Sequence, residues 1–111
     1  MELKNIFNRI PKDIPKEIFE EIVSVKNCRI QRIISKGQST PDGQWYDQDL
    51  DEWVILLQGS AGLLFEGSDN LINLQPGDYL HIPANAKHRV EWTDQSQETI
   101  WLAVRYNSQV N

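Results

Sequence analysis

The chain has 111 residues, of which 40% are hydrophobic and 24% charged, a composition that fits one globular domain with a single core. Its net charge of −5 without clustered Lys and Arg argues against a nucleic-acid partner, and no apolar run approaches the ~20 residues that cross a membrane. The single cysteine, Cys28, cannot form an intramolecular disulfide, and the opening segment has charges where a signal peptide is apolar, so we expect a cytoplasmic protein.

The first predicted element is a short helix within residues 1–27, which we treat as an N-terminal helical segment. Pro15 can occupy the first turn of a helix. Four apolar residues then recur at spacings of three and four: Ile18, Phe19, Ile22 and Val23. We expect this helix to lie across the outside or the mouth of the domain that follows.

From Cys28 onward the pattern predicts short strands separated by polar turns. Alternating or apolar stretches occupy residues 28–35, 52–59, 59–67, 71–83, 88–93 and 99–106. Counting the hairpins within them, about eight strands follow one another at intervals of about ten residues. This arrangement predicts an antiparallel sandwich or barrel that forms one domain over residues 28–111.

The stretch at 52–59 is apolar on both of its faces. One face carries Glu52, Val54, Leu56 and Gln58, and the other carries Trp53, Ile55 and Leu57. A strand of this kind belongs between two layers or against a partner chain. We therefore expect a homodimer, with coverage of this face by the N-terminal helix as the alternative.

Two stretches resemble the two sequence motifs of the cupin superfamily. In "GDYLHIPANAKH", Gly77, Pro83 and His88 match the second motif, and in "EWVILLQG", Glu52 and Gly59 match the end of the first. The resemblance extends over nearly the whole chain after the predicted helix. It implies an all-β fold, a cupin-type jelly-roll β-barrel preceded here by a short N-terminal helix, and proteins of this family are often dimers.

The first motif departs from the family, which normally has His-x-His shortly before the glutamate. Depending on the gap, those two positions hold Tyr46 and Gln48, or Trp45 and Asp47. A one-residue change of register decides which pair faces the barrel interior. In the second motif, Asn85 stands where the family usually has glycine, and Asn can also adopt the left-handed backbone conformation. The resemblance therefore supports the fold but transfers no catalytic activity.

The candidate metal ligands are Glu52, His88, Asp47 and Gln48. Such an oxygen-rich set favours manganese or iron(II), with zinc and nickel as further options, and would bind the ion weakly. The alternative for His88 is a structural, hydrogen-bonded residue. Without a metal, two carboxylates facing one apolar cavity would raise the pKa of at least one of them, which could then act as a general acid or base.

Further candidates for the lining of the pocket are Tyr46, His81, Trp92 and Trp101. Aromatic side chains offer stacking surfaces and polar N–H or O–H groups to a small ligand, although filling the core is their commoner use. His81 can also be a strand residue that is partly exposed. Arg105 shares a strand face with Trp101, and we expect it to pair with a carboxylate.

The sequence leaves three functions open. The first is a small-molecule enzyme with a weak divalent-metal site. The second is a metal-free domain that binds a small polar or carbohydrate-like molecule, and the third is an interaction module without catalysis. The fold does not choose among them, because one fold can host many activities.

Overall fold

The computed structural model describes residues 1–108, and every regular element in that range is a β-strand. The strands are β1 (Ile18–Val25), β2 (Cys28–Ser35), β3 (Asp51–Gln58), β4 (Ala61–Phe65), β5 (Ile72–Leu74), β6 (Tyr79–Ile82), β7 (His88–Thr93) and β8 (Thr99–Tyr106). Within this described range no helix is long and apolar enough to cross a membrane.

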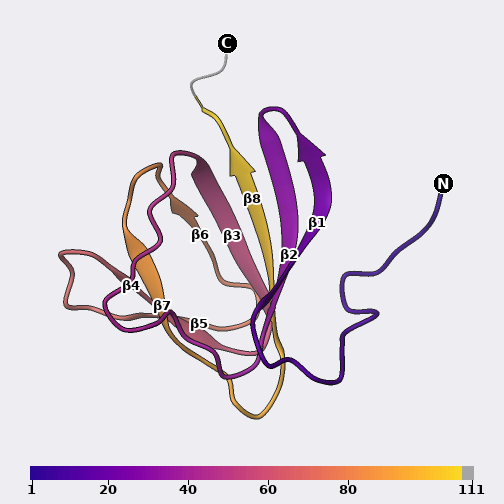
Figure 1. Ribbon diagram of the computed structural model, residues 1–111, viewed down its shortest axis with the longest axis horizontal. Coiled ribbons are helices and arrows are strands. Elements are labelled where there is room, and N and C mark those ends of the chain that lie inside the picture. The colour runs from indigo at the N-terminus through magenta and orange to yellow at the C-terminus, as the bar shows by residue number, and fades with distance from the viewer. Residues whose placement is uncertain (109–111) are drawn as a thin grey trace.

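The strands form two sheets, which confirms the predicted jelly-roll β-barrel (Figure 1). The larger sheet has the order β1-β2-β8-β3-β6, and the smaller has the order β5-β4-β7. All of the pairs are antiparallel. Both candidate motifs thus reach the same barrel, because β3 lies in the larger sheet and β7 in the smaller.

The core lies between the inner faces of the two sheets. On β3, Val54 and Leu56 alternate with outward-facing residues, and the register of the larger sheet places Ala103 and Trp101 of β8 beside them. Leu63 of β4 comes from the opposite sheet, and all five side chains belong to one buried cluster. Burial of this kind stabilises the fold by roughly 25 cal/mol per Å² of apolar surface.

The predicted N-terminal helix is wrong, because residues 18–25 form strand β1. This strand pairs with β2 through a two-residue turn at Lys26 and Asn27. The register of the pair shifts between Glu21 and Val23, which adds one residue to β1 and interrupts its alternation. The extra residue gives the apolar side chains of this strand a spacing that resembles that of a helix. Hydrogen bonding to β2 makes the segment a strand.

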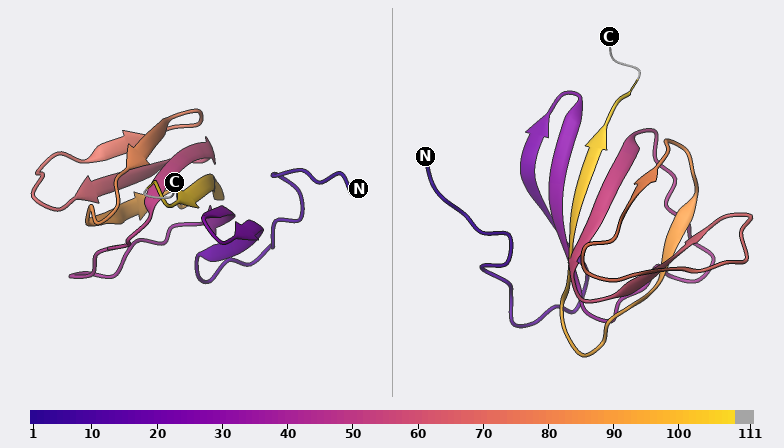
Figure 2. Two further views of the ribbon diagram at one scale, coloured as in Figure 1. Left: turned by 90° about the horizontal axis from the view of Figure 1, so that it is seen from above. Right: turned by 180° about the vertical axis from the view of Figure 1, so that it is seen from behind.

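The N-terminal segment is anchored to the outside of the larger sheet by Arg32. The Nη1 atom of Arg32 donates hydrogen bonds to the carbonyl oxygens of Ile6, at 3.0 Å, and Asn8, at 2.6 Å. Its Nη2 atom binds the carboxylate of Glu20 on β1. The first residues of the chain extend away from the strands in both views of Figure 2, so Arg32 holds the point at which this segment meets the barrel.

Candidate functional site

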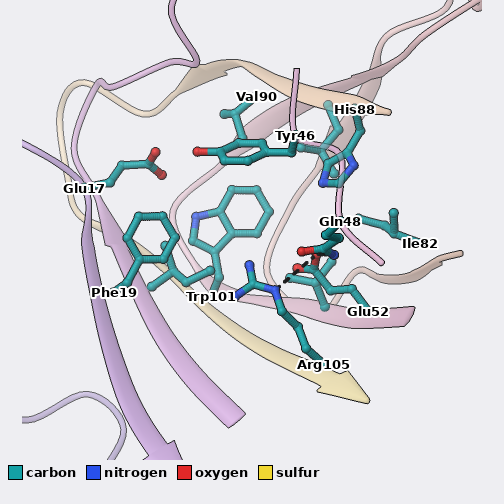
Figure 3. Close-up of a pocket in the computed structure, with 13 residues that line it drawn as sticks. Glu17, Phe19, Tyr46, Gln48, Glu52, Ile82, His88, Val90, Trp101 and Arg105 are labelled. Carbon is teal, nitrogen blue, oxygen red and sulfur yellow. Dashed lines mark hydrogen bonds and ion pairs between the residues drawn. The ribbon is translucent and has the colours of Figure 1, made fainter. Parts of the chain in front are cut away.

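A cavity of about 50 Å³ lies between the two sheets and is the candidate site (Figure 3). A volume of this size accommodates a few water molecules or a small ligand. Much of its wall is apolar, and six polar or charged side chains reach it: Glu17, Tyr46, Gln48, Glu52, His88 and Arg105. Phe19 and Tyr46, 47% and 39% exposed, mark the side on which solvent approaches.

Two main-chain contacts turn Tyr46 and Gln48 into the cavity. Tyr46 pairs with His88 as an isolated antiparallel bridge, in which each amide donates to the carbonyl of the other residue, at 2.7 and 3.1 Å. The amide of Asn85 donates to the carbonyl of Gln48 at 2.7 Å, and Asn85 has the expected left-handed conformation, with φ of 67°. The register of this segment therefore brings in Tyr46 and Gln48, while Asp47 between them points to solvent.

Arg89 holds the loop that leads to Tyr46. Its guanidinium donates to the main-chain carbonyls of Thr40, at 2.8 Å, Pro41, at 3.2 Å, and Gln44, at 3.3 Å. It also lies 5.8 Å from the ring centre of Trp45, a distance typical of a cation–π contact. This loop lacks regular structure of its own, and Arg89 adds to the main-chain hydrogen bond that the amide of Thr40 donates to the carbonyl of Val90 at 2.9 Å.

Glu52 is the centre of a polar cluster at one end of the cavity. It is 5% exposed, and its Oε1 atom accepts a 2.8 Å hydrogen bond from Nε2 of Gln48. The Nε atom of Arg105 lies 3.8 Å from the same oxygen, which confirms that Arg105 pairs with a carboxylate. Arg105 in turn donates to Oε1 of Gln31, whose Nε2 atom donates to Glu21 at 2.8 Å. The buried charge of Glu52 is thus balanced by a cation from the next strand.

His88 lies on the smaller sheet, at the same cavity, and is 5% exposed. Its Nδ1 atom is 2.9 Å from the carbonyl oxygen of Ala86. A carbonyl can only accept, so Nδ1 carries the proton in the neutral ring and Nε2 retains its lone pair. The imidazole is packed between the rings of Tyr46 and Phe65, each with its centre 5.7 Å away. His88 can therefore accept a hydrogen bond from a ligand in a fixed orientation.

Glu17 and Tyr46 form a second polar group at the other end of the cavity. In Figure 3 the carboxylate of Glu17 and the hydroxyl of Tyr46 both lie on the side away from Glu52. The hydroxyl of Ser35 donates to Oε2 of Glu17 at 2.8 Å. Burial raises the pKa of the Glu17 carboxyl, and the Ser35 hydrogen bond offsets part of that rise. Burial and then the nearby charge of Glu17 also raise the pKa of Tyr46.

Two buried N–H groups in the cavity wall have no hydrogen-bond partner within residues 1–108. They are Nε1 of Trp101, a residue that is only 4% exposed, and Nε of Arg105. An unsatisfied buried donor costs about 1–3 kcal/mol. In Figure 3 the indole nitrogen of Trp101 faces the end of the cavity that holds Glu17. Both donors are positioned to be satisfied by an occupant with acceptor atoms or by ordered water.

Three residues proposed from the sequence lie away from the cavity. Asp47 is exposed. His81 lies on the outer face of the larger sheet because it pairs with Trp53, and its Nε2 atom is 3.7 Å from Asp51. Trp92 lies beside Gly62 on β4, with its indole N–H 3.3 Å from the side-chain oxygen of Asn73. Of the four residues expected to line the pocket, the structure places Tyr46 and Trp101 there.

Glu17, Phe19 and Gln31 are the residues that sequence reasoning missed. The sequence pattern predicts a helix for the segment that holds Glu17 and Phe19, whereas the hairpin of β1 and β2 carries Phe19 to the cavity opposite Ile33. Gln31 is 5% exposed in the middle of β2, where its amide connects Arg105 with Glu21. No local signal distinguishes Gln31, because the same strand also carries Arg29 and Arg32.

The donor set at Glu52 does not fit a resident divalent cation well. Within the described range, no group of three or more His, Cys, Asp or Glu side chains could hold a metal ion. Besides Glu52 and His88, the candidate ligand set at the cavity contains only the side-chain amide of Gln48, which is a weak metal ligand. Arg105 already places a positive charge 3.8 Å from Glu52, and that charge would repel a metal ion bound to the same carboxylate.

Comparisons with known proteins agree with this architecture. A sequence profile of the cupin domain family matches residues 32–105. A candidate mannose-6-phosphate isomerase from Ralstonia eutropha is 44% identical, with a TM-score of 0.93 over 97% of this chain and 100% of that one. A cupin superfamily protein from Desulfitobacterium hafniense is 20% identical, with a TM-score of 0.72 over 89% and 84%. The comparison with curated proteins gave no match.

Proposed function

The chain belongs to the cupin superfamily, and we propose that it binds a small polar molecule in the cavity between its two sheets without a resident metal ion. The observation that carries the proposal is the position of Arg105 beside Glu52. A guanidinium provides the positive charge that this carboxylate needs, together with fixed N–H groups for a ligand. Gln48 and His88 add an amide and a ring nitrogen at the same end of the cavity.

A ligand screen in the presence of EDTA tests this proposal. Thermal shifts are measured with a panel of small polyols, sugars, carboxylates and amines, and the binders are then titrated by calorimetry. Glu52→Gln removes the charge at the site, whereas Glu66→Gln makes the same change at an exposed turn. We expect roughly 10- to 100-fold weaker binding to the first variant, because a hydrogen bond to a charged group is lost, and no change for the second. The same screen is repeated without EDTA. Binding that is seen only without EDTA, or no binding by any compound, contradicts the proposal.

A weak divalent-cation site at Glu52, His88 and Gln48 is the second candidate function. It is favoured by the free Nε2 lone pair of His88, since a neutral imidazole nitrogen is a good ligand for manganese, iron(II), nickel or zinc. Titration of each metal into the wild type and into His88→Ala tests the site. His81→Ala is the matched control, because His81 lies on the outer face. Equal binding by the wild type and His88→Ala rejects this candidate.

Mannose 6-phosphate belongs in the ligand panel because of the similarity to the Ralstonia protein. Ligand pockets for drug-sized molecules have volumes of about 300–1,000 Å³, whereas this cavity has about 50 Å³. We therefore expect a hexose phosphate to bind more weakly than a compound of three to five carbons, with part of it outside the mouth. An assay of mannose 6-phosphate isomerisation with the same samples tests catalysis directly.

We also propose a homodimer formed through the outer face of the larger sheet. Trp53, Ile55 and Leu57 of β3 point away from the cavity and remain partly exposed, and Leu102 and Val104 of β8 extend the same apolar surface. Apolar patches of this kind often mark contacts between chains. Light scattering coupled to gel filtration tests the proposal, and a shift to monomer is expected for Ile55→Glu.

A further inference from the structure

The unpartnered indole N–H of Trp101 points to a ligand group that accepts a hydrogen bond. Trp101 is 4% exposed, lines the cavity, and has no partner for Nε1 among residues 1–108. Buried polar groups in folded proteins are almost always satisfied, so a donor left open at a cavity wall marks a position where a ligand or an ordered water binds. This donor faces the end of the cavity away from Glu52, outside the cluster that carries the proposed function.

An acceptor faces the same space. The Oε2 atom of Glu17 is held by the hydroxyl of Ser35 at 2.8 Å, which orients the carboxylate and leaves Oε1 available to an occupant. The phenol of Tyr46 lies on the same side of the cavity in Figure 3, and the charge of Glu17 acts on it directly. This end of the cavity thus presents a fixed N–H donor, a carboxylate acceptor and the hydroxyl of Tyr46, which also contacts the side chain of Thr40.

A hydroxyl group matches this combination better than other small polar groups. It can accept from the indole N–H and donate to the carboxylate at the same time. A ligand carboxylate would meet the like charge of Glu17, and an ammonium group would present further donors to the indole N–H. The aromatic rings of Trp101 and Phe19 form the adjacent wall and offer flat surfaces to the C–H groups that carry hydroxyls in polyols and sugars.

We propose that Glu17, Tyr46 and Trp101 form a hydroxyl-binding subsite and that the ligand of the cavity is a small neutral polyol. This inference rests on the proposed function and extends it by naming the chemical class of the ligand. A second hydroxyl of the same molecule reaches the cluster of Gln48, Glu52 and Arg105 at the opposite end. The ligand therefore needs oxygen atoms at both of its ends and no net charge.

The indole N–H signal of Trp101 in proton–nitrogen NMR spectra is a direct test. The signal is assigned in the wild type from through-bond experiments and followed during titrations with erythritol and xylitol in the presence of EDTA. We expect a saturable shift of this signal and no shift of the indole signal of Trp92, which lies outside the cavity. The four-carbon acid erythronate has the same size with a negative charge, and we expect it to bind at least tenfold more weakly.

Two variants separate the failure of this subsite from the failure of the proposed function. Trp101→Phe keeps a ring but removes the donor, and Glu17→Ala removes the acceptor; we expect roughly 3- to 10-fold weaker polyol binding for each. Polyol binding that is unchanged in both variants overturns the subsite and leaves the proposed function standing.

Tighter binding of erythronate than of erythritol overturns the subsite as well. If neither polyol shifts the Trp101 signal, the subsite is rejected, while the wider panel with Glu52→Gln still decides the proposed function. If Trp101→Phe does not fold, polyol binding by Glu17→Ala and the indole N–H signal of Trp101 in the wild type still test the subsite.

Discussion

The Nε atom of Arg105 lies 3.8 Å from Oε1 of Glu52 across neighbouring strands of the larger sheet, and both side chains are largely buried. Removing either partner leaves the other charge without its counterpart. We therefore expect Arg105→Gln and Glu52→Gln each to lower the free energy of unfolding by about 1–3 kcal/mol. Urea denaturation of the wild type, the two single variants and the double variant measures the coupling. Effects that simply add in the double variant would show that the two side chains act independently.

Gly59 is expected to tolerate no side chain. It has φ of +87°, and a Cβ atom there would lie 2.7 Å from Cα of Thr99 and 2.9 Å from the carbonyl oxygen of Glu98. Gly59→Ala combines backbone strain with a steric clash against main-chain atoms, so we expect a loss of about 2–5 kcal/mol in the free energy of unfolding. Gly67 has a similar φ of +85° with nothing within 4 Å, and Gly67→Ala should lose only about 1–2 kcal/mol. If chemical denaturation gives equal losses in the free energy of unfolding for Gly59→Ala and Gly67→Ala, the close approach of Gly59 to Thr99 and Glu98 has no role.

Glu17 should make the protein less stable as the pH rises. Burial raises its pKa above the ordinary value of 4.5, so the folded state binds this proton more tightly than the unfolded state. The contribution of Glu17 to stability is therefore greatest below pH 4.5 and declines as the pH rises through the pKa of the folded state. Glu17→Gln removes this decline while keeping an acceptor for Ser35. We expect the melting temperature of Glu17→Gln relative to wild type to be higher at pH 7 than at pH 4, and the opposite trend would contradict the pKa direction.

Asp94 should show the reverse dependence. Hydrogen bonds from the amide and hydroxyl of Ser96, with Gln97 and Ser60 as further donors, lower its pKa from 3.8 to about 2. The stability that it contributes is present above pH 3.8 and is lost as the pH falls through about 2. Asp94→Asn should therefore reduce the melting temperature at pH 7 and have little effect near pH 2. A pH-independent difference between wild type and variant would show that the charge is not responsible.

The barrel could be predicted from the sequence because its motifs depend on local chemistry. Gly59 needs a left-handed conformation beside Thr99, and Asn85 supplies one at the turn before β7. Both faces of β3 are apolar, so the match of Glu52 to the first motif is what points to the inner face, and the structure places Glu52, Val54 and Leu56 on that face. Each of these features is encoded within a few consecutive residues.

Two parts of the site depend on contacts between distant segments and could not be predicted locally. The pairing of Tyr46 with His88 decides which residues of the first motif face inward, and a shift by one residue would have reversed the set. The irregularity in β1 between Glu21 and Val23 imitates helical spacing, so the sequence pattern predicts Glu17 and Phe19 in a helix across the outside or the mouth of the domain. Pairing with β2 overrides the local pattern in this segment.

Strand β1 lies at the edge of its sheet and has a single neighbour, β2. Edge strands held on one side can fray while the remaining structure stays folded. Since Phe19 of this strand lines the cavity, fraying of β1 would open one wall of the cavity. Such opening would give a bound molecule a second path of exchange with solvent, beside the mouth marked by Phe19 and Tyr46.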